Sequence, residues 1–198
     1  AIREDHTPLF DLTDSHAFGL LLSHEAGAFN GSHIPFLLDR PGATAAGENG
    51  RLLGHLAAAN GHADALDGRE VLCVFQGPHG YISPRWYLKK PAVPTWNYMV
   101  VHVYGKAKVT RDPAQVREIV DRLSKVYEPA EGGWRLDDEP DTYVSAVLRA
   151  IVGIEIEITR LEGKFKLNQH RPNDTPGVAA ALRSAGVDAV FAPATERI

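Results

Sequence analysis

The stretch Tyr81-Ile-Ser-Pro-Arg-Trp-Tyr-Leu-Lys-Lys-Pro-Ala-Val-Pro-Thr-Trp-Asn-Tyr98 carries the most information about the fold. It holds two of the three tryptophans and three of the six tyrosines, interleaved with three prolines. Because proline lacks a backbone donor and clashes with the preceding turn, this composition excludes an ordinary helix. Flat aromatic faces beside polar groups suit a flat ligand with polar edges, but most aromatic side chains pack inside the protein. The stretch is therefore compatible with two interpretations, a packing loop and a ligand-binding loop.

Outside this stretch, the composition is that of an ordinary globular protein. The 198 residues are 44% hydrophobic and 23% charged, so we expect a single domain over residues 1–198. No apolar run approaches the roughly 18 residues that span a bilayer, which predicts no membrane partner. The single cysteine, Cys73, excludes an intramolecular disulfide and favours a cytoplasmic location. The net charge of −4 argues against a chain-wide nucleic-acid footprint, without excluding a local basic patch.

Several segments have the periodicity of β-strands. Residues 153–161 alternate strictly, with isoleucines on one face and glutamates on the other. Glu162-Gly163 follows, and residues 164–168 alternate again, which predicts a C-terminal hairpin. Further strands are predicted at residues 33–38, 70–76 and 99–109.

Helical patterns are fewer. Asp112-Pro113 is typical of a helix start, and we expect a helix from there to about Tyr127. Its buried stripe is predicted to consist of Val116, Ile119, Val120, Leu123 and Val126. Two more helices are predicted at 141 to about 152 and at 175–185, the latter closed by Gly186. Many strands and few helices predict a mainly β fold, a barrel with helical additions.

The common nucleotide and metal motifs are missing from the sequence. It has no G-x-G-x-x-G, no Walker A motif, no H-E-x-x-H pattern and no nucleophile elbow. Of the nine histidines, His33, His55, His79 and His102 are predicted to lie in different elements, so a metal or haem site would require them to converge in three dimensions. The catalytic residues, if any, stay unassigned, with His55, His79 and His102 as candidates only if they line a ligand groove.

Two polar segments suit an anion. Lys164, Lys166, Gln169 and Arg171 combine charge with amide donors, as phosphate binding requires, although a solvated outer face explains them equally well. Asn60 is a good cap type for a short helix that follows a strand, and free N–H groups at such an end can hold an anion.

Several motifs occur in an order that resembles one protein family. The most specific are Ser83-Pro-Arg-Trp-Tyr87 and Val93-Pro-Thr-Trp-Asn-Tyr98 in tandem. The others lie at residues 31–39, 54–60, 75–80, 101–105, 150–158 and 164–169. Together, from about Pro8 to Ala185, they resemble the PaiB-like FMN-binding negative transcriptional regulators.

The resemblance implies a fold similar to the FMN-binding split β-barrel of pyridoxamine-phosphate oxidases and flavin reductases. It also implies a homodimer with FMN in the groove between the subunits. The phosphate and ribityl chain would lie near Ser32, His33, Ile34, His55, Leu56, Asn60 and His62. Trp96 and Asn97 would lie near the flavin ring. Lys164, Lys166, Gln169 and Arg171 would reach the groove, from the partner subunit.

The chain departs from the family pattern at three places in this predicted site. Lys166-Leu-Asn-Gln-His170 stands where the family has Lys-Leu-Ser-Gln-Asn. Ala59-Asn-Gly-His-Ala63 stands where the family has Ala-Asn-Pro-x-Trp. The strand that carries Ser32 lacks the arginine that often pairs with the FMN phosphate in related oxidases.

The resemblance assigns the protein to transcriptional regulation. A flavin-dependent oxidoreductase without direct DNA binding is the alternative, and the missing helix-turn-helix pattern and the sequence pI near 6.1 both favour it. A second alternative is a haem-binding split barrel that uses one of the histidines.

Overall fold

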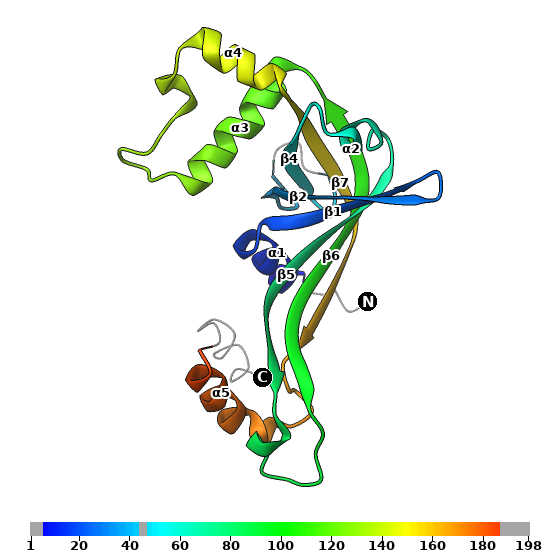
Figure 1. Ribbon diagram of the computed structural model, residues 1–198, viewed down its shortest axis with the longest axis vertical. Coiled ribbons are helices and arrows are strands. Elements are labelled where there is room, and N and C mark those ends of the chain that lie inside the picture. The colour runs from blue at the N-terminus through cyan, green and yellow to red at the C-terminus, as the bar shows by residue number, and fades with distance from the viewer. Residues whose placement is uncertain (1–5, 44–46, 187–198) are drawn as a thin grey trace. The chain divides into compact units, whose positions relative to one another are not determined.

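The computed structural model describes residues 6–43 and 47–186, which form one seven-stranded sheet with attached helices (Figure 1). The strand order is β2-β1-β5-β6-β7-β4-β3. The strands are β1 (Phe18–Glu25), β2 (Ala28–Pro35), β3 (Leu37–Asp39), β4 (Arg51–Ala57), β5 (Glu70–Ile82), β6 (Thr95–Thr110) and β7 (Ile151–Lys166). The α-helices are α1 (Thr7–Ser15), α2 (Gly61–Asp64), α3 (Pro113–Tyr127), α4 (Asp141–Arg149) and α5 (Thr175–Ser184). None of the helices in the described residues is long and apolar enough to cross a membrane.

Contacts between residues divide the chain into two compact units. Unit 1 comprises the described parts of residues 1–75 and 102–162, and unit 2 those of 76–101 and 163–198. The strands β5, β6 and β7 each contribute residues to both units. The single domain over residues 1–198 stays a prediction.

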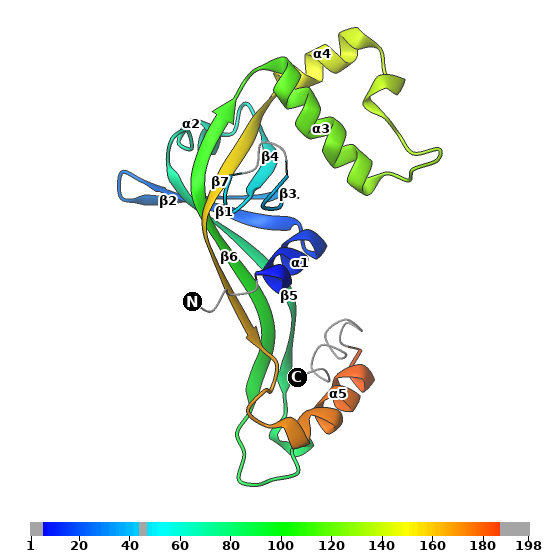
Figure 2. The same cartoon turned by 180° about the vertical axis from the view of Figure 1, so that it is seen from behind.

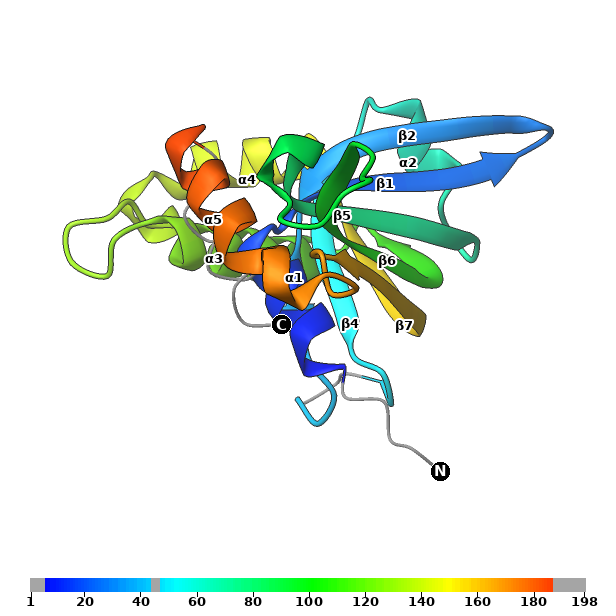
Figure 3. The same cartoon turned by 90° about the horizontal axis from the view of Figure 1, so that it is seen from below.

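In unit 1 the two ends of the sheet approach each other. The hairpin of β1 and β2 turns at Ala26 and Gly27, which both have positive φ, and its tip extends beyond the residues of β1 that pair with β5 (Figure 3). At the other end of the strand order, β4 passes close to the end of β2. A side chain at Gly54 would place its Cβ 3.1 Å from both the Ile34 Cδ1 atom and the Pro35 carbonyl oxygen. The lack of a side chain at Gly54 therefore allows the sheet to curl toward closure.

The helix α3 begins and ends where the sequence predicts, with the Asp112 carboxylate accepting a 2.8 Å hydrogen bond from the Ala114 N–H. Its buried face packs on the sheet through Ile119 and Leu123, which contact Leu37 and Leu53. It packs on α4 through a second cluster formed by Val116, Leu136, Val144 and Leu148, with Val120 and Ile151 beside it. Figures 1 and 2 show α3 and α4 side by side where β6 ends and β7 begins. The predicted stripe is wrong at Val126, which is 63% exposed because it lies beyond both clusters.

In unit 2, residues 81–98 form the end of β5, a 3₁₀ turn at Pro84–Trp86 and the start of β6. The Tyr87 side chain is buried, and its hydroxyl donates to the Asn168 Oδ1 atom over 3.2 Å. The buried Asp174 carboxylate accepts a 2.6 Å hydrogen bond from the Leu88 N–H. Part of this aromatic stretch is therefore a packed loop, whereas Trp96 is 53% exposed.

Three predicted boundaries need correction. The C-terminal hairpin is wrong, because β7 continues through Glu162 and Gly163, and neither residue takes the positive φ that a two-residue hairpin turn requires. The helix predicted at 141–152 ends at Arg149, because the β-branched residues from Ile151 onward extend β7. The strand predicted at 33–38 is interrupted at Phe36 between β2 and β3. The sequence prediction also missed α1, and it missed β1 because three successive leucines mask the alternation.

Candidate functional site

The register of β1 and β2 separates the three predicted residues Ser32, His33 and Ile34. Ser32 pairs with Leu21 and Ile34 with Gly19, so both face the interior side of the hairpin. His33 pairs with Leu20 on the opposite, outer face, where its ring stacks on Phe18 with the centroids 6.0 Å apart. His33 therefore belongs to a different surface from its two neighbours.

On the interior side, four polar residues from β1, β2, the β4–α2 connection and α2 form one hydrogen-bonded cluster, called the His62 cluster below: Ser23, Ser32, Asn60 and His62. The Ser32 hydroxyl lies 2.8 Å from the His62 Nδ1 atom, and the Ser23 hydroxyl lies 3.0 Å from the Nε2 atom. The Asn60 amide nitrogen donates to the Ser32 hydroxyl over 3.4 Å. The structure thus brings together Ser32, Asn60 and His62 of the predicted site.

Burial determines the direction of the hydrogen bonds in the His62 cluster. His62 is 6% exposed, and burial lowers its pKa, so the imidazole is neutral and has one donor and one acceptor nitrogen. The Ser23–His62 contact fits either tautomer of the ring, but the Ser23 hydroxyl is buried and its proton needs an acceptor, so we assign Ser23 as the donor to Nε2. His62 then carries its proton on Nδ1 and donates to Ser32. The hydroxyl proton of the half-buried Ser32 is left free to donate to a ligand.

Asn60 has a second role at the start of α2. Its side-chain Oδ1 accepts a 3.0 Å hydrogen bond from the His62 N–H, so it caps the helix as the sequence predicts. The cap forms although the chain departs from the family pattern at this point. The sequence prediction missed Ser23, because a single serine after three leucines carries no signal until the pairing of β1 is known.

The predicted residues His55 and Leu56 on β4 lie on opposite faces of that strand. Leu56 pairs with Val152 and is part of the core. His55 pairs with Gly153, on the face against which α3 packs, since a Cβ at Gly153 would lie 2.9 Å from the Ile119 Cδ1 atom. The His55 Nδ1 atom is buried without a hydrogen-bond partner, and burial lowers the pKa of the imidazole. His55 is not among the hydrogen-bonded members of the His62 cluster.

Unit 2 contains the predicted aromatic residues. Trp96 lies beside His79 and Tyr81, with ring centroids 6.3 and 6.0 Å away. Its neighbour Asn97 is completely buried, and neither its Oδ1 nor its Nδ2 atom has a hydrogen-bond partner. A ligand can reach the Trp96 face, whereas the Asn97 amide is closed to the outside.

Three of the four predicted phosphate contacts bind other parts of unit 2. The Lys166 ammonium donates to the Thr95 hydroxyl, and the Gln169 side chain bonds to the backbone of residues 165 and 167. Arg171 lies over the Tyr87 ring at 4.6 Å and pairs with Asp174 at 3.4 Å. Lys164 is exposed and has no partner among residues 6–43 and 47–186. The role of all four toward a ligand stays a prediction.

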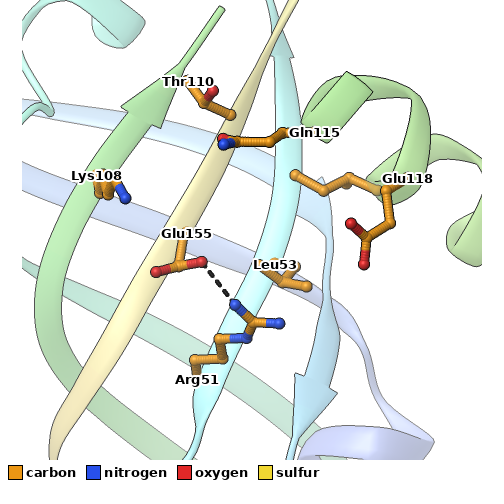
Figure 4. A pocket seen from close by; sticks show the side chains of 8 residues that line it. Arg51, Leu53, Lys108, Thr110, Gln115, Glu118 and Glu155 are labelled. Atoms are coloured by element: carbon orange, nitrogen blue, oxygen red, sulfur yellow. Dashed lines mark hydrogen bonds and ion pairs between the residues drawn. The ribbon is translucent and has the colours of Figure 1, made fainter. Parts of the chain in front are cut away.

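A further concavity in unit 1, of about 270 Å³, lies between α3 and the strands β4, β6 and β7 (Figure 4). Its main charged group, Arg51, donates to the carboxylates of Asp39 and Glu155 over 2.9 and 2.8 Å. Burial alone would raise the pKa of Asp39, but the hydrogen bonds from Arg122 and Arg51 outweigh it and hold that pKa below its usual value. These charges compensate one another, so this concavity is a structural ion network. No group of three or more metal-binding side chains occurs in the described part of the chain.

Comparison with solved structures defines the class of protein. The flavocytochrome Anf3 of Azotobacter vinelandii has the same fold with a TM-score of 0.62 at 15% identity, covering 82% of this chain and 68% of the other. An FAD- and haem-binding protein of Mycobacterium smegmatis matches with a TM-score of 0.55 at 16% identity, covering 82% and 71%. The fold is therefore the split β-barrel of flavin-binding proteins, mainly β with helical additions, as the sequence predicts.

Sequence comparison then gives the family. A family model described as "Putative FMN-binding domain" matches residues 2–160. The protease synthase and sporulation protein PAI 2 of Bacillus subtilis is 30% identical over 168 residues, which cover 84% of this chain and 78% of that protein. An uncharacterised protein of Emericella nidulans is 37% identical over 193 residues, covering 80% and 76%. The chain belongs to this PaiB-like family of FMN-binding domains.

Proposed function

We propose that this protein binds FMN, with the polar tail of the flavin at the His62 cluster. The observation that carries the proposal is the contact of the half-buried Ser32 hydroxyl with the His62 Nδ1 atom at 2.8 Å, while the buried Ser23 hydroxyl contacts Nε2 at 3.0 Å. In the tautomer assigned above, the Ser32 hydroxyl proton is free to bind a ligand. Phosphate and ribityl oxygens accept hydrogen bonds, and the Asn60 amide offers a second donor beside Ser32. The His62 cluster fits this part of the flavin by its hydrogen-bonding capacity.

The charge of the phosphate requires a further contribution. His62 is neutral, and no lysine or arginine belongs to the His62 cluster within the described residues. A second copy of the chain is the source that we propose, with the flavin in the groove between two subunits. Lys164, Lys166 and Arg171 are the predicted candidates, and the exposed, unpaired Lys164 is the freest of them.

The outer face of β2, β1 and β5 supports a homodimer. The register places several apolar side chains on this face, together with His24 and His33. Phe18 and Phe29 are 66% and 80% exposed, and the half-buried Leu20, Leu22, Leu72 and Val74 lie between them. An exposed apolar surface of this kind marks a protein interface.

Among the activities open to such a protein, we favour a flavin-dependent oxidoreductase over direct DNA binding. Bound FMN would supply electron or hydride transfer, while the protein would hold and orient it. The helix α3 carries Arg117, Arg122 and Lys125, but also Glu118 and Asp121, so its polar face is mixed in charge. A recognition helix would need a predominantly basic face for DNA phosphates. A regulatory role would therefore act through the flavin or a protein partner.

The test is a titration of the purified protein with FMN and with riboflavin, followed by flavin fluorescence. Asn60→Asp keeps the helix cap but places a carboxylate beside the proposed phosphate position. We expect about a tenfold loss of FMN affinity, or about 1.4 kcal/mol, and little change for riboflavin, which lacks the phosphate. Ser15→Ala, at an exposed position on α1, is the control.

Equal FMN affinity of Asn60→Asp and the unchanged protein would overturn the placement of the phosphate. Absence of FMN binding at micromolar concentration would overturn the flavin function. A Soret band in the absorbance spectrum would favour the haem alternative. Leu22→Asp on the outer face is expected to give monomers in sedimentation analysis and to weaken FMN binding. The cytoplasmic location stays a prediction.

A further inference from the structure

A cavity of about 620 Å³ lies between α3 and α4 in unit 1. Its floor includes Leu148 and Ile151, which belong to the apolar cluster that joins the two helices. Its walls carry three arginines, Arg111 from the segment after β6, Arg117 from α3 and Arg149 from the last turn of α4. Packing fixes Leu148 and Ile151, so the three arginines line a cavity whose apolar part is held in place.

The existing partners of these arginines can be replaced. Arg111 pairs with Asp64 at 3.0 Å and Arg117 pairs with Asp137; the side chains of Arg111, Asp64 and Asp137 are well exposed, whereas that of Arg117 is 38% exposed. Exposed ion pairs of this kind contribute little to stability, so a stronger anion can displace the carboxylates. Arg149 has no hydrogen-bond or ion-pair partner among residues 6–43 and 47–186. The cavity is therefore lined by one guanidinium without a partner in the described residues and by two whose ion pairs contribute little to stability.

We propose that this cavity binds a small molecule that carries a phosphate group on an apolar or aromatic body of about mononucleotide size. Guanidinium groups match phosphate oxygens in pairs and bind them more specifically than lysine does. The volume lies within the range of small-molecule sites, and Leu148 with Ile151 offers an apolar surface for the body of the ligand. The Ala114 N–H at the start of α3 is already taken by Asp112, so binding rests on the arginines.

This site is separate from the His62 cluster and does not depend on FMN binding there. None of the residues that line the cavity belongs to the His62 cluster. The ligand would make this part of unit 1 a second, regulatory or substrate-binding position on the protein.

The experiment is calorimetric titration of the full chain with AMP, inorganic phosphate and adenosine, with and without saturating FMN. Saturable AMP binding is expected, with weaker binding of phosphate and none of adenosine. Arg149→Gln and Arg117→Gln should each lower AMP affinity at least fivefold and leave FMN affinity unchanged. Arg85→Gln, which removes the same charge from an exposed position in unit 2, is the matched control. Ser145→Glu places a negative charge on the exposed α4 wall and should also abolish AMP binding.

Three results would overturn the inference. AMP that fails to saturate, or a loss in Arg85→Gln equal to that in Arg149→Gln, would show that no specific phosphate site exists. An FMN affinity that falls in Arg149→Gln but not in Asn60→Asp would show that the cavity is the flavin phosphate site. Failure of FMN binding alone would leave the AMP titration intact, so the two proposals fail separately.

Discussion

His62 in unit 1 and Asn97 in unit 2 are both buried polar side chains, and they differ in whether their hydrogen bonds are made. Both ring nitrogens of His62 have a hydroxyl partner, and its backbone N–H is bound by Asn60. Both polar atoms of the Asn97 amide have none. The sequence suggested that both residues belong to one flavin site, yet only His62 lies in a complete network.

The difference has an energetic meaning. A typical buried hydrogen bond contributes about 1 kcal/mol net, whereas a buried polar group without a partner costs about 1–3 kcal/mol. The His62 cluster is therefore a rigid arrangement that exists before any ligand arrives, and it fixes the direction of the Ser32 hydroxyl. Asn97 instead weakens the folded chain unless another molecule or a rearrangement satisfies its amide.

Replacing His62 by leucine should have the largest effect. His62→Leu removes the partner of the buried Ser23 hydroxyl and the group that orients Ser32. We expect a loss of about 3 kcal/mol in the free energy of unfolding, measured in urea, because a buried donor is left without a partner and packing is disturbed. FMN affinity should fall in parallel.

The control for this change is His170→Leu, at an exposed position in unit 2. It should alter the free energy of unfolding by less than about 0.5 kcal/mol, as surface substitutions usually do. If both variants lose similar stability, the His62 cluster is not the source of the effect.

Replacing Asn97 by leucine should have a smaller effect of opposite sign. Asn97→Leu exchanges an unpaired amide for an apolar group of similar size, and we expect a gain of about 1 kcal/mol in the free energy of unfolding. Urea unfolding of the protein without flavin measures it. A loss of stability would mean that the Asn97 amide is hydrogen-bonded in the assembled protein, which would end the contrast with His62.

The sequence allowed the fold class to be predicted because strict alternation and helix caps are local signals. Residues 153–158 alternate between isoleucine and glutamate, and Asp112-Pro113 marks the start of α3 within one residue. Local signals failed where two elements join without a break. The Glu162-Gly163 pair resembles a turn in composition, but its backbone stays extended inside β7.

The candidate site was predictable only in part, for a geometric reason. Ser32 and His33 are neighbours in sequence, yet the alternation of a strand places them on opposite faces, and the face of each depends on the pairing of β2 with β1. Ser23 could not be singled out in the sequence, where it is a single serine after three leucines. Only the folded chain brings His62 beside it. The sequence could not show that Lys166 and Arg171 have partners, because Thr95 and Asp174 come beside them only in the folded chain.

The smallest predicted effect concerns pH. Burial lowers the pKa of His62 and of His55 below the ordinary value of 6.5, whereas both titrate near 6.5 in the unfolded chain. The unfolded chain therefore binds more protons below pH 6.5, so stability is fully present above that pH and is lost as the pH falls toward the lowered folded-state values. Urea unfolding between about pH 7.5 and 5 measures the decline, and His55→Phe combined with His62→Leu should flatten it. Asp39 does not affect stability in this pH range. Because its pKa in the folded chain lies below the ordinary value of 3.8, its contribution to the free energy of unfolding declines only below pH 3.8. A decline that persists in the double variant would place the titrating groups elsewhere and remove the evidence that His62 is neutral.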